Sequence, residues 1–280
     1  MNCSEVISNA AYILKENLIK NPYLDSEMLL SKALKIKREN LLTNLNMKLK
    51  NKDIIKFNKL IERRRKKEPI AYILGYKSFW KSNFKVNQDV LIPRPETEHV
   101  IEEVLKIIPK SASYNILDVG TGSGCLIVSI ILERQRSRGT AIDISKNAIN
   151  IAKYNAKIQH IENRIKFVNS NIDKFNRGKY DLIISNPPYI KKFKIKYLED
   201  DVKLYEPKVA LDGGIDGYSN LKKVIKKSSK LLKTKGKLIL EIDDKQKNIT
   251  NKILKQNGFY TNKIVKDLAK KYRCIVSTKI

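Results

Sequence analysis

The sequence predicts an α/β protein with a mostly parallel seven-stranded sheet, preceded by a small helical bundle and a β-hairpin linker. Three observations predict it. Apolar residues recur at helical spacing from about residue 4 to 68, and the period changes to that of a hairpin between residues 69 and 95. After Pro109, short apolar runs alternate with helical stretches, which indicates repeated strand–helix–strand units. Continuously apolar strands are typical of a parallel sheet that is covered on both faces.

Length and composition set the broad class. The chain has 280 residues, of which 42% are hydrophobic and 31% are charged, as in a soluble globular protein. No apolar run approaches the roughly 18 to 20 residues of a membrane helix, and the charged residues among the first thirty leave no signal peptide. Three cysteines and two histidines are too few for a disulfide framework or a zinc site. We therefore expect a cytoplasmic protein with no metal and no membrane contact.

The net charge of +28 arises from 57 Lys+Arg against 29 Asp+Glu. Such a field attracts anionic partners such as nucleic acid or ribosomes. Only 11 of the cations are arginine, which is the better residue for bidentate phosphate recognition, so the lysine surplus is equally well read as solvated surface. The charge therefore permits electrostatic attraction to ribosomes without identifying a partner.

The N-terminal 75 residues are predicted to form a helical substrate-docking domain. Val6, Ile7 and Ala10 begin an apolar stripe at three-to-four spacing, and residues 24–33 and 53–65 repeat this pattern. The basic run 63–67 is interpreted as a solvated helix end beside the C-terminal dipole rather than as a nucleic-acid site. We assign residues 76–95 to the hairpin linker and residues 96–280 to the catalytic domain.

The catalytic domain begins with a helix. Thr97 has the place of an N-cap, and the helix is expected to end near Ile108 because Pro109 follows. The remaining predicted elements are strands at 115–119, 139–144, 166–168, 181–185, 237–242, 263–265 and 272–278, and helices at 125–133, 147–156, 221–232 and 249–256. In such a sheet, ligands bind at the carboxyl ends of the strands.

The first motif that carries chemistry follows the strand 115–119. Asp118 is followed by the loop Gly120, Thr121, Gly122, Ser123 and Gly124. Glycines allow the backbone to pass close to a ligand, and amides at the start of the next helix face it. The spacing G-x-G-x-G departs from the dinucleotide fingerprint, so it predicts a nucleotide-like cofactor in general.

Asp143 ends the next strand, twenty-five residues after Asp118. A carboxylate at this place can accept hydrogen bonds from both hydroxyls of a ribose. The alternative interpretation is that Asp143 only caps the helix that begins near Ser145.

The third motif, Asn186-Pro187-Pro188-Tyr189, directly follows the strand 181–185. Two prolines give an extended backbone without N–H donors, so the Asn186 side-chain oxygen and a proline carbonyl can face one small group. Two such acceptors suit a planar amine or amide nitrogen, whose lone pair they would align with an electrophile. Tyr189 can stack on the planar group, and no strong general base is required.

Taken in order, these motifs resemble those of a class I S-adenosylmethionine-dependent methyltransferase, which has a Rossmann-like fold. Further segments resemble the peptide chain release factor glutamine methyltransferase family, also called PrmC or HemK, along nearly the full length. These segments are Glu68–Gly75, Leu91–Glu98, Ser185–Ile190, Tyr205–Pro207 and Ala210–Gly217.

The resemblance implies methyl transfer from S-adenosyl-L-methionine to the side-chain amide nitrogen of the glutamine in the Gly-Gly-Gln motif of class I release factors. It implies that residues 120–124 hold the methionine part of the cofactor, that Asp143 holds its ribose, and that Ile172 covers one face of adenine. Asn186 and Pro187 would be catalytic, and with Pro188 and Tyr189 they would hold the glutamine. Arg94 and Glu96 would organise the nearby wall, and the helical domain and linker would dock the release factor.

Two positions depart from the pattern of that family. Asn171 stands where an acidic contact to the adenine amine is usual, and Asp243 stands where glycine is usual. Three alternative functions stay open: methylation of a ribosomal protein glutamine, methylation of adenine in nucleic acid, and non-catalytic binding to ribosomes. The second is disfavoured because the chain has no aromatic-rich basic insertion that resembles a target-recognition domain, so no direct contact with nucleic acid is required.

Overall fold

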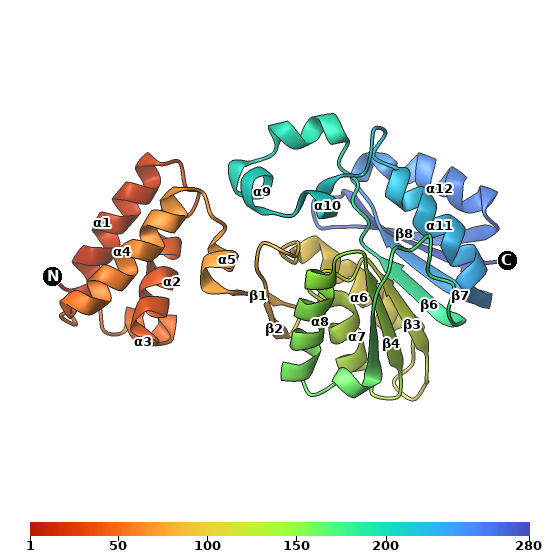
Figure 1. Cartoon of the computed structure of the whole chain (residues 1–280), viewed down its shortest axis with the longest axis horizontal. Helices are drawn as coiled ribbons and strands as arrows, with labels where there is room; N and C mark the ends of the chain where they lie inside the picture. Colours follow the sequence, from red (N-terminus) through yellow and green to blue (C-terminus); the bar gives the residue numbers. More distant parts are fainter. The chain divides into compact units, whose positions relative to one another are not determined.

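The computed structural model describes residues 1–280, and the chain divides into two compact units. One unit comprises residues 1–75 together with 199–205, and the other comprises residues 76–198 and 206–280. Figure 1 labels the helices and strands of both units. No helix in either unit combines the length and the apolar character that crossing a membrane requires.

The first unit is a helical bundle around a core that includes Leu14, Leu29 and Phe57. Helix α1 begins with a capping box, in which the Asn2 side chain accepts from the Glu5 N–H and the Glu5 carboxylate accepts from the Asn2 N–H. Its helices are α1 (Cys3–Glu16), α2 (Pro22–Leu34), α3 (Arg38–Leu42), α4 (Asn51–Arg65), α5 (Ile70–Leu74) and α9 (Asp200–Tyr205). The predicted helical N-terminal region is confirmed.

The basic run at the end of α4 is only partly solvated, which corrects the sequence-based interpretation. Arg64 is buried, and its Nε lies 2.7 Å from Oδ2 of Asp25, which is also buried. Arg63 pairs with Glu68, and Arg65 pairs with Glu62. Because these guanidinium groups already have carboxylate partners, this run offers few free charges to an external anion.

The second unit contains a seven-stranded sheet in the order β5-β4-β3-β6-β7-β9-β8. All neighbouring pairs from β5 to β7 are parallel, whereas β9 is antiparallel to β7 and β8. The strands are β3 (Asn115–Val119), β4 (Arg138–Asp143), β5 (Ile165–Asn169), β6 (Tyr180–Ser185), β7 (Leu232–Glu241), β8 (Phe259–Lys266) and β9 (Tyr272–Lys279). The predicted mostly parallel seven-stranded sheet is confirmed.

Alternate residues along each central strand point into two different cores. Ile116 of β3 faces a core shared with α6 (Glu98–Ile107), α7 (Cys125–Glu133) and α8 (Lys146–Ile158). Leu117 faces a core shared with α11 (Ser219–Leu231) and α12 (Lys247–Gln256). The sheet is therefore covered by helices on both faces, as Figure 1 shows.

A two-stranded hairpin precedes the sheet. Strands β1 (Tyr76–Phe79) and β2 (Ser82–Lys85) pair in antiparallel register, and Phe79 and Phe84 enter the core that contains α6 and α7. Asn155 of α8 fastens the hairpin, because its side chain accepts from the Lys85 N–H and donates to the Lys85 carbonyl. The same amide donates to the Ser123 carbonyl, so it also ties the hairpin to the glycine-rich loop.

The remaining short elements lie between the longer ones. Four are 3₁₀ segments, η1 (Pro95–Thr97), η2 (Glu162–Arg164), η3 (Lys192–Tyr197) and η4 (Asp244–Gln246), and one is the short helix α10 (Lys208–Leu211). The sequence predicted none of these. The prediction that the Thr97 side chain caps α6 is wrong, because Thr97 has helical backbone angles and its side chain makes no capping hydrogen bond.

Candidate active site

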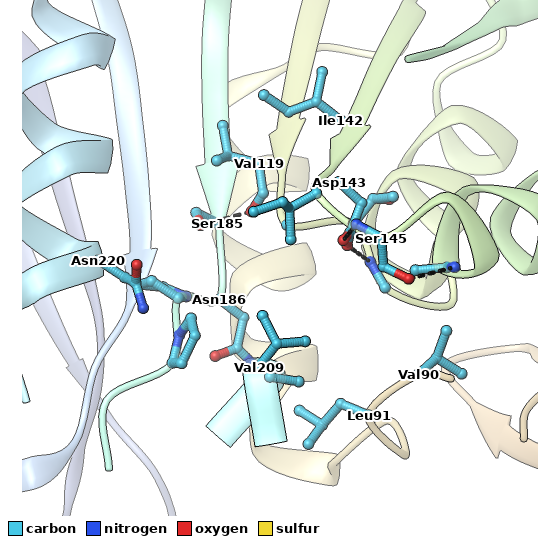
Figure 2. Close-up of a pocket in the computed structure, with 18 of the residues that line it drawn as sticks. Val90, Leu91, Val119, Ile142, Asp143, Ser145, Ser185, Asn186, Val209 and Asn220 are labelled. Carbon is cyan, nitrogen blue, oxygen red and sulfur yellow. Dashed lines mark hydrogen bonds between the residues drawn. The ribbon is translucent and has the colours of Figure 1, made fainter. Parts of the chain in front are cut away.

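A cleft opens at the carboxyl ends of β3, β4 and β6, where the parallel sheet predicts a ligand site. The cleft has an empty volume of about 1270 Å³, which includes the space at its open mouth. Figure 2 shows Asp143 and Ser145 on one side of the cleft, Asn186, Val209 and Asn220 on another, and Val90 and Leu91 closing a third. All of the lining residues belong to the second unit.

The glycine-rich loop forms one wall of the cleft. Gly120 and Gly122 have backbone φ angles of 75° and 53°, which residues other than glycine rarely adopt. A Cβ on either residue would meet nothing within 4 Å. Both residues, with Thr121 and Ser123, line the cleft. Gly124 does not line it. A Cβ there would lie 3.0 Å from the Ala152 Cβ, so this glycine permits α7 to pack closely against α8.

Asp143 binds the glycine-rich loop as well as lining the cleft. Its Oδ2 accepts from the Gly122 N–H at 2.9 Å, and its Oδ1 accepts from the Ser145 N–H at 2.9 Å. The side-chain cap of α8 is Ser145, so Asp143 is not the capping residue of that helix. Burial raises the pKa of the Asp143 carboxyl, while the two backbone hydrogen bonds oppose that shift. A carboxylate has about four lone-pair sites, so both oxygens can still accept a hydroxyl.

The loop after β5 forms the wall beyond Asp143. Ile144, Asn171 and Ile172 all line the cleft there. The Asn171 side-chain oxygen accepts from the Asp173 N–H at 2.9 Å, which is the geometry of an Asx turn. An apolar surface on Ile144 and Ile172 suits the face of a planar ring, whereas the Asn171 oxygen is already engaged in holding the loop.

The Asn186–Tyr189 segment begins where β6 ends. The buried Ser185 hydroxyl donates to the Val119 carbonyl at 2.7 Å and so joins the ends of β6 and β3. Asn186, Pro187 and Pro188 line the cleft, but Tyr189 is not among the lining residues. Burial, reinforced by the Glu241 charge, raises the pKa of Tyr189 to about 12, so its hydroxyl stays protonated near neutral pH.

A glycine-containing segment supports this loop from behind. The Gly213 N–H donates to the Ile190 carbonyl at 2.8 Å, and the Ile190 N–H donates to the Leu211 carbonyl. A Cβ on Gly213 would lie 2.8 Å from the Tyr189 Cα, and one on Gly217 would lie 2.8 Å from the Tyr189 carbonyl oxygen. These contacts leave no room for larger side chains, which explains the glycines physically.

Thr97 lines the cleft beside Asn186, and Glu241 lies next to Asn186 at the end of β7; sequence reasoning did not assign either of them to the site. Ser185 of β6 is paired with Leu240 of β7, so the next residues, Asn186 and Glu241, leave adjacent strand ends. The Asn186 Nδ2 donates to the Thr97 Oγ1 at 3.2 Å. Burial raises the pKa of Glu241 to about 7, and hydrogen bonds from Thr97 and Asn186 oppose that shift. A buried acid at a parallel strand end was the available signal for Glu241.

Three further residues that sequence reasoning singled out can now be placed. Arg94 lines the cleft and forms an ion pair with the buried Glu206, which ties the loop before η1 to the chain preceding α10. Glu96 does not line the cleft, and its carboxylate lies 3.9 Å from the Arg273 guanidinium. Asp243 is the N-cap of η4, where it forms a capping box with Gln246. Its role is therefore local and structural.

Asn220 and Lys223 of α11 also line the cleft, although no sequence motif pointed to them. The Asn220 Nδ2 donates to the Asp212 carbonyl at 3.0 Å. Both residues lie on an amphipathic helix, where their spacing matches that of ordinary solvent-facing positions. Only the packing of α11 against the sheet reveals that this end of the helix meets the cleft.

The lining residues fit an amphipathic nucleoside cofactor. The two glycines leave open space beside their backbone, Asp143 keeps acceptor capacity for ribose hydroxyls, and Ile172 offers an apolar face to a planar ring. Asn186 lies on another side of the same cleft, as Figure 2 shows. A cofactor bound by the glycine-rich loop, Asp143 and Ile172 would therefore leave room for an acceptor group at Asn186.

Comparisons with known proteins agree with this geometry. A family model described as "PrmC N-terminal domain" matches residues 5–75, and one described as "Methyltransferase domain" matches residues 110–277. The crystal structure of a methyltransferase from Pyrococcus furiosus has the same fold, with a TM-score of 0.54 and 17% identity over 72% of this chain and 91% of that one.

Two curated relatives are similar along nearly the whole chain. A release factor glutamine methyltransferase from Caulobacter vibrioides is 33% identical over 95% of this chain and 92% of its own length. Another from Fusobacterium nucleatum is 37% identical over 98% of this chain and 78% of its own length. At this identity and coverage, the chain belongs to the release factor glutamine methyltransferase family.

Proposed function

We propose that this protein transfers a methyl group from S-adenosyl-L-methionine to the side-chain amide nitrogen of a glutamine in class I peptide chain release factors. The observation that carries the proposal is the placement of Asn186 and Pro187 in the same cleft as the glycine-rich loop and Asp143. The names of the full-length relatives support the choice of glutamine and release factor.

The cofactor would be held by the wall opposite Asn186. The amides of residues 120–123 would face its methionine part, Asp143 would accept from its ribose hydroxyls, and Ile172 would contact its adenine. S-adenosylmethionine supplies an electrophilic methyl group on a sulfonium centre. The glycine-rich loop is fixed by Asp143 and by hydrogen bonds from Gly120 and Thr121 to the Ile142 carbonyl, so this wall is organised before binding.

The acceptor nitrogen would be held by two oxygens. The Asn186 Oδ1 and the Pro187 carbonyl would each accept one N–H of the glutamine amide, which would aim the nitrogen lone pair at the methyl group. These oxygens would also stabilise the positive charge that develops on the nitrogen during transfer. The nitrogen can lose its proton after the methyl group has moved, so no strong base is needed beside it.

We further propose that the helical unit docks the release factor. Its residues contribute nothing to the lining of the cleft, and residues 5–75 match a dedicated N-terminal family domain. A chain that needed only to bind the cofactor and one glutamine side chain would have no use for this unit. The site proposed for the methyl acceptor therefore lies in one unit and the proposed docking surface lies in the other.

Methyl transfer to purified acceptors tests the proposal. The enzyme is incubated with labelled S-adenosylmethionine and one of four acceptors: a class I release factor, the same factor with the Gly-Gly-Gln glutamine replaced, ribosomal proteins, or duplex DNA. We expect label on the intact release factor alone. Label on DNA or on ribosomal proteins instead would refute the substrate assignment, and equal label on the replaced factor would refute the assigned glutamine.

A further inference from the structure

The Asn186 amide contacts Thr97, a buried residue that also lines the cleft, and Glu241 lies at the end of the neighbouring strand and does not line it. We propose that Thr97, supported by Glu241, is a positioning residue that holds the Asn186 Nδ2 away from the acceptor subsite so that Oδ1 faces it. This inference rests on the proposed function and extends it to a pair of buried residues that do not touch the methyl acceptor.

The hydrogen-bond chemistry of the three groups gives the direction. An asparagine amide can present either its oxygen or its NH₂ group to a neighbour, and only the oxygen can accept from a substrate N–H. The Asn186 Nδ2 donates to the Thr97 Oγ1 at 3.2 Å. Glu241 accepts from both the Thr97 hydroxyl and the Asn186 amide. A Thr97 hydroxyl that donates to Glu241 keeps its lone pairs for the Asn186 Nδ2. The reversed amide would place two oxygens, Asn186 Oδ1 and Thr97 Oγ1, against each other.

The burial of these groups indicates a functional reason for them. Thr97 is 3% exposed and Glu241 is 4% exposed, and the Glu241 Oε2 has no hydrogen-bond partner. A buried carboxyl group with an unpaired oxygen destabilises a fold relative to an apolar side chain of similar size. Helix α6 does not use Thr97 as a capping side chain either. Orientation of Asn186 is the one use of this pair that the geometry provides.

The decisive variant is Thr97→Val, which keeps the shape of the side chain and removes the hydroxyl. We expect kcat for the release factor to fall about twofold or more, because the amide would then adopt both orientations and only one of them presents its oxygen to the acceptor. Cofactor affinity, measured by equilibrium binding, is expected to stay within about twofold, because Thr97 lies on the Asn186 side of the cleft. Thr97→Ser restores the hydroxyl and is expected to restore most of kcat.

Thr250→Val is the matched control, since Thr250 is also fully buried and its Oγ1 has no partner. It removes a buried hydroxyl from α12 and is expected to leave kcat unchanged. Glu241→Leu is expected to lower kcat as Thr97→Val does, and the double variant is expected to lose little more than either alone, because both act through Asn186. Additive losses would show that the two residues do not act on the same group and would overturn the part of Glu241 in the proposal.

A second measurement is independent of turnover. Side-chain amide exchange of Asn186, followed by ¹⁵N NMR on the full chain, is expected to be slow in the wild type and faster in Thr97→Val. Full kcat and unchanged exchange in Thr97→Val would overturn the positioning role. A wild-type enzyme that does not methylate the release factor would instead refute the proposed function, so the two failures can be told apart.

Discussion

Asn186 contributes one amide oxygen to the proposed acceptor subsite, and its removal gives the most direct test at the scale of a residue. We expect Asn186→Ala to lower single-turnover transfer to the release factor by about 10²-fold or more, as the loss of one charge-stabilising contact does elsewhere. Cofactor affinity should change by only a few-fold. Asn220→Ala, which trims another asparagine that lines the cleft, is the control and should retain most activity. Survival of transfer in Asn186→Ala would refute the mechanism.

The buried carboxyl of Glu241 makes stability depend on pH. Burial raises its pKa from 4.5 to about 7, so the folded chain holds this proton at pH values where the unfolded chain has released it. The contribution to stability is therefore complete below about pH 4.5 and is lost as the pH rises through about 7. Asp118, whose pKa burial also raises to about 7, changes stability in the same direction.

Glu241→Gln removes the ionisation of Glu241 but leaves that of Asp118. We expect the unfolding free energy of this variant, relative to the wild type, to improve by about 1 to 3 kcal/mol between pH 5 and pH 8. Urea denaturation at both pH values measures the difference. A difference between the two proteins that does not vary with pH would show that Glu241 does not titrate in this range.

At the scale of an element, the Asn186–Tyr189 loop depends on the glycine segment behind it. Gly213→Ala places a Cβ 2.8 Å from backbone atoms of Tyr189, which cannot move aside as a side-chain end can. We expect kcat to fall and stability to drop by about 1 to 3 kcal/mol. Gly139→Ala is the control, because its Cβ would meet only the side chains of Ile127 and Ile165, neither of which lines the cleft. It should cost stability but leave kcat unchanged. Equal kcat in both variants would contradict the supporting role.

The sequence predicted the long elements because their periodicity is local. Strand β3 and helix α7 match the predicted ranges 115–119 and 125–133, since each has a continuous apolar pattern and the glycine-rich loop 120–124 separates them. Thr97 shows why local pattern fails elsewhere. Its place before a helix predicts a capping side chain, but the hydrogen-bond partner of that side chain is Asn186, which lies 89 residues away in the sequence. The same is true of Arg64, whose partner Asp25 lies 39 residues earlier.

The cleft itself was predictable to the extent that its residues follow strands. The glycine-rich loop, Asp143 and Asn186 each stand next to a strand end, so the topology of a parallel sheet brings them together. Asn220 and Lys223 were not predictable, because they lie on a helix whose end meets the cleft only through packing. An acidic residue at a strand end was a signal for Glu241, but its place beside Asn186 depends on the register between β6 and β7, which the sequence does not contain.

At the scale of the whole molecule, both units carry an excess of lysine and arginine over aspartate and glutamate. The basic run at the end of α4 is largely paired with carboxylates, and the lining of the cleft includes Arg94 and Lys223 beside Asp89 and Asp143. A diffuse positive field attracts polyanions without selecting a sequence or a base. It therefore gives no support to adenine in nucleic acid as the methyl acceptor.

A DNA-binding measurement distinguishes non-specific attraction of phosphates by the positive charge from a specific recognition site. We expect a short DNA duplex to bind at low salt, with log K falling steeply and linearly against log of the salt concentration, because cations on many parts of the surface neutralise phosphates. Charge reversal at the exposed Lys226 should change the affinity only slightly, since no single lysine dominates such a field. No methyl group should be transferred to the bound duplex. Saturable methylation of adenine in that duplex, or loss of most binding from one lysine, would show that the charge forms a recognition site, and the nucleic-acid alternative would then replace the one proposed here.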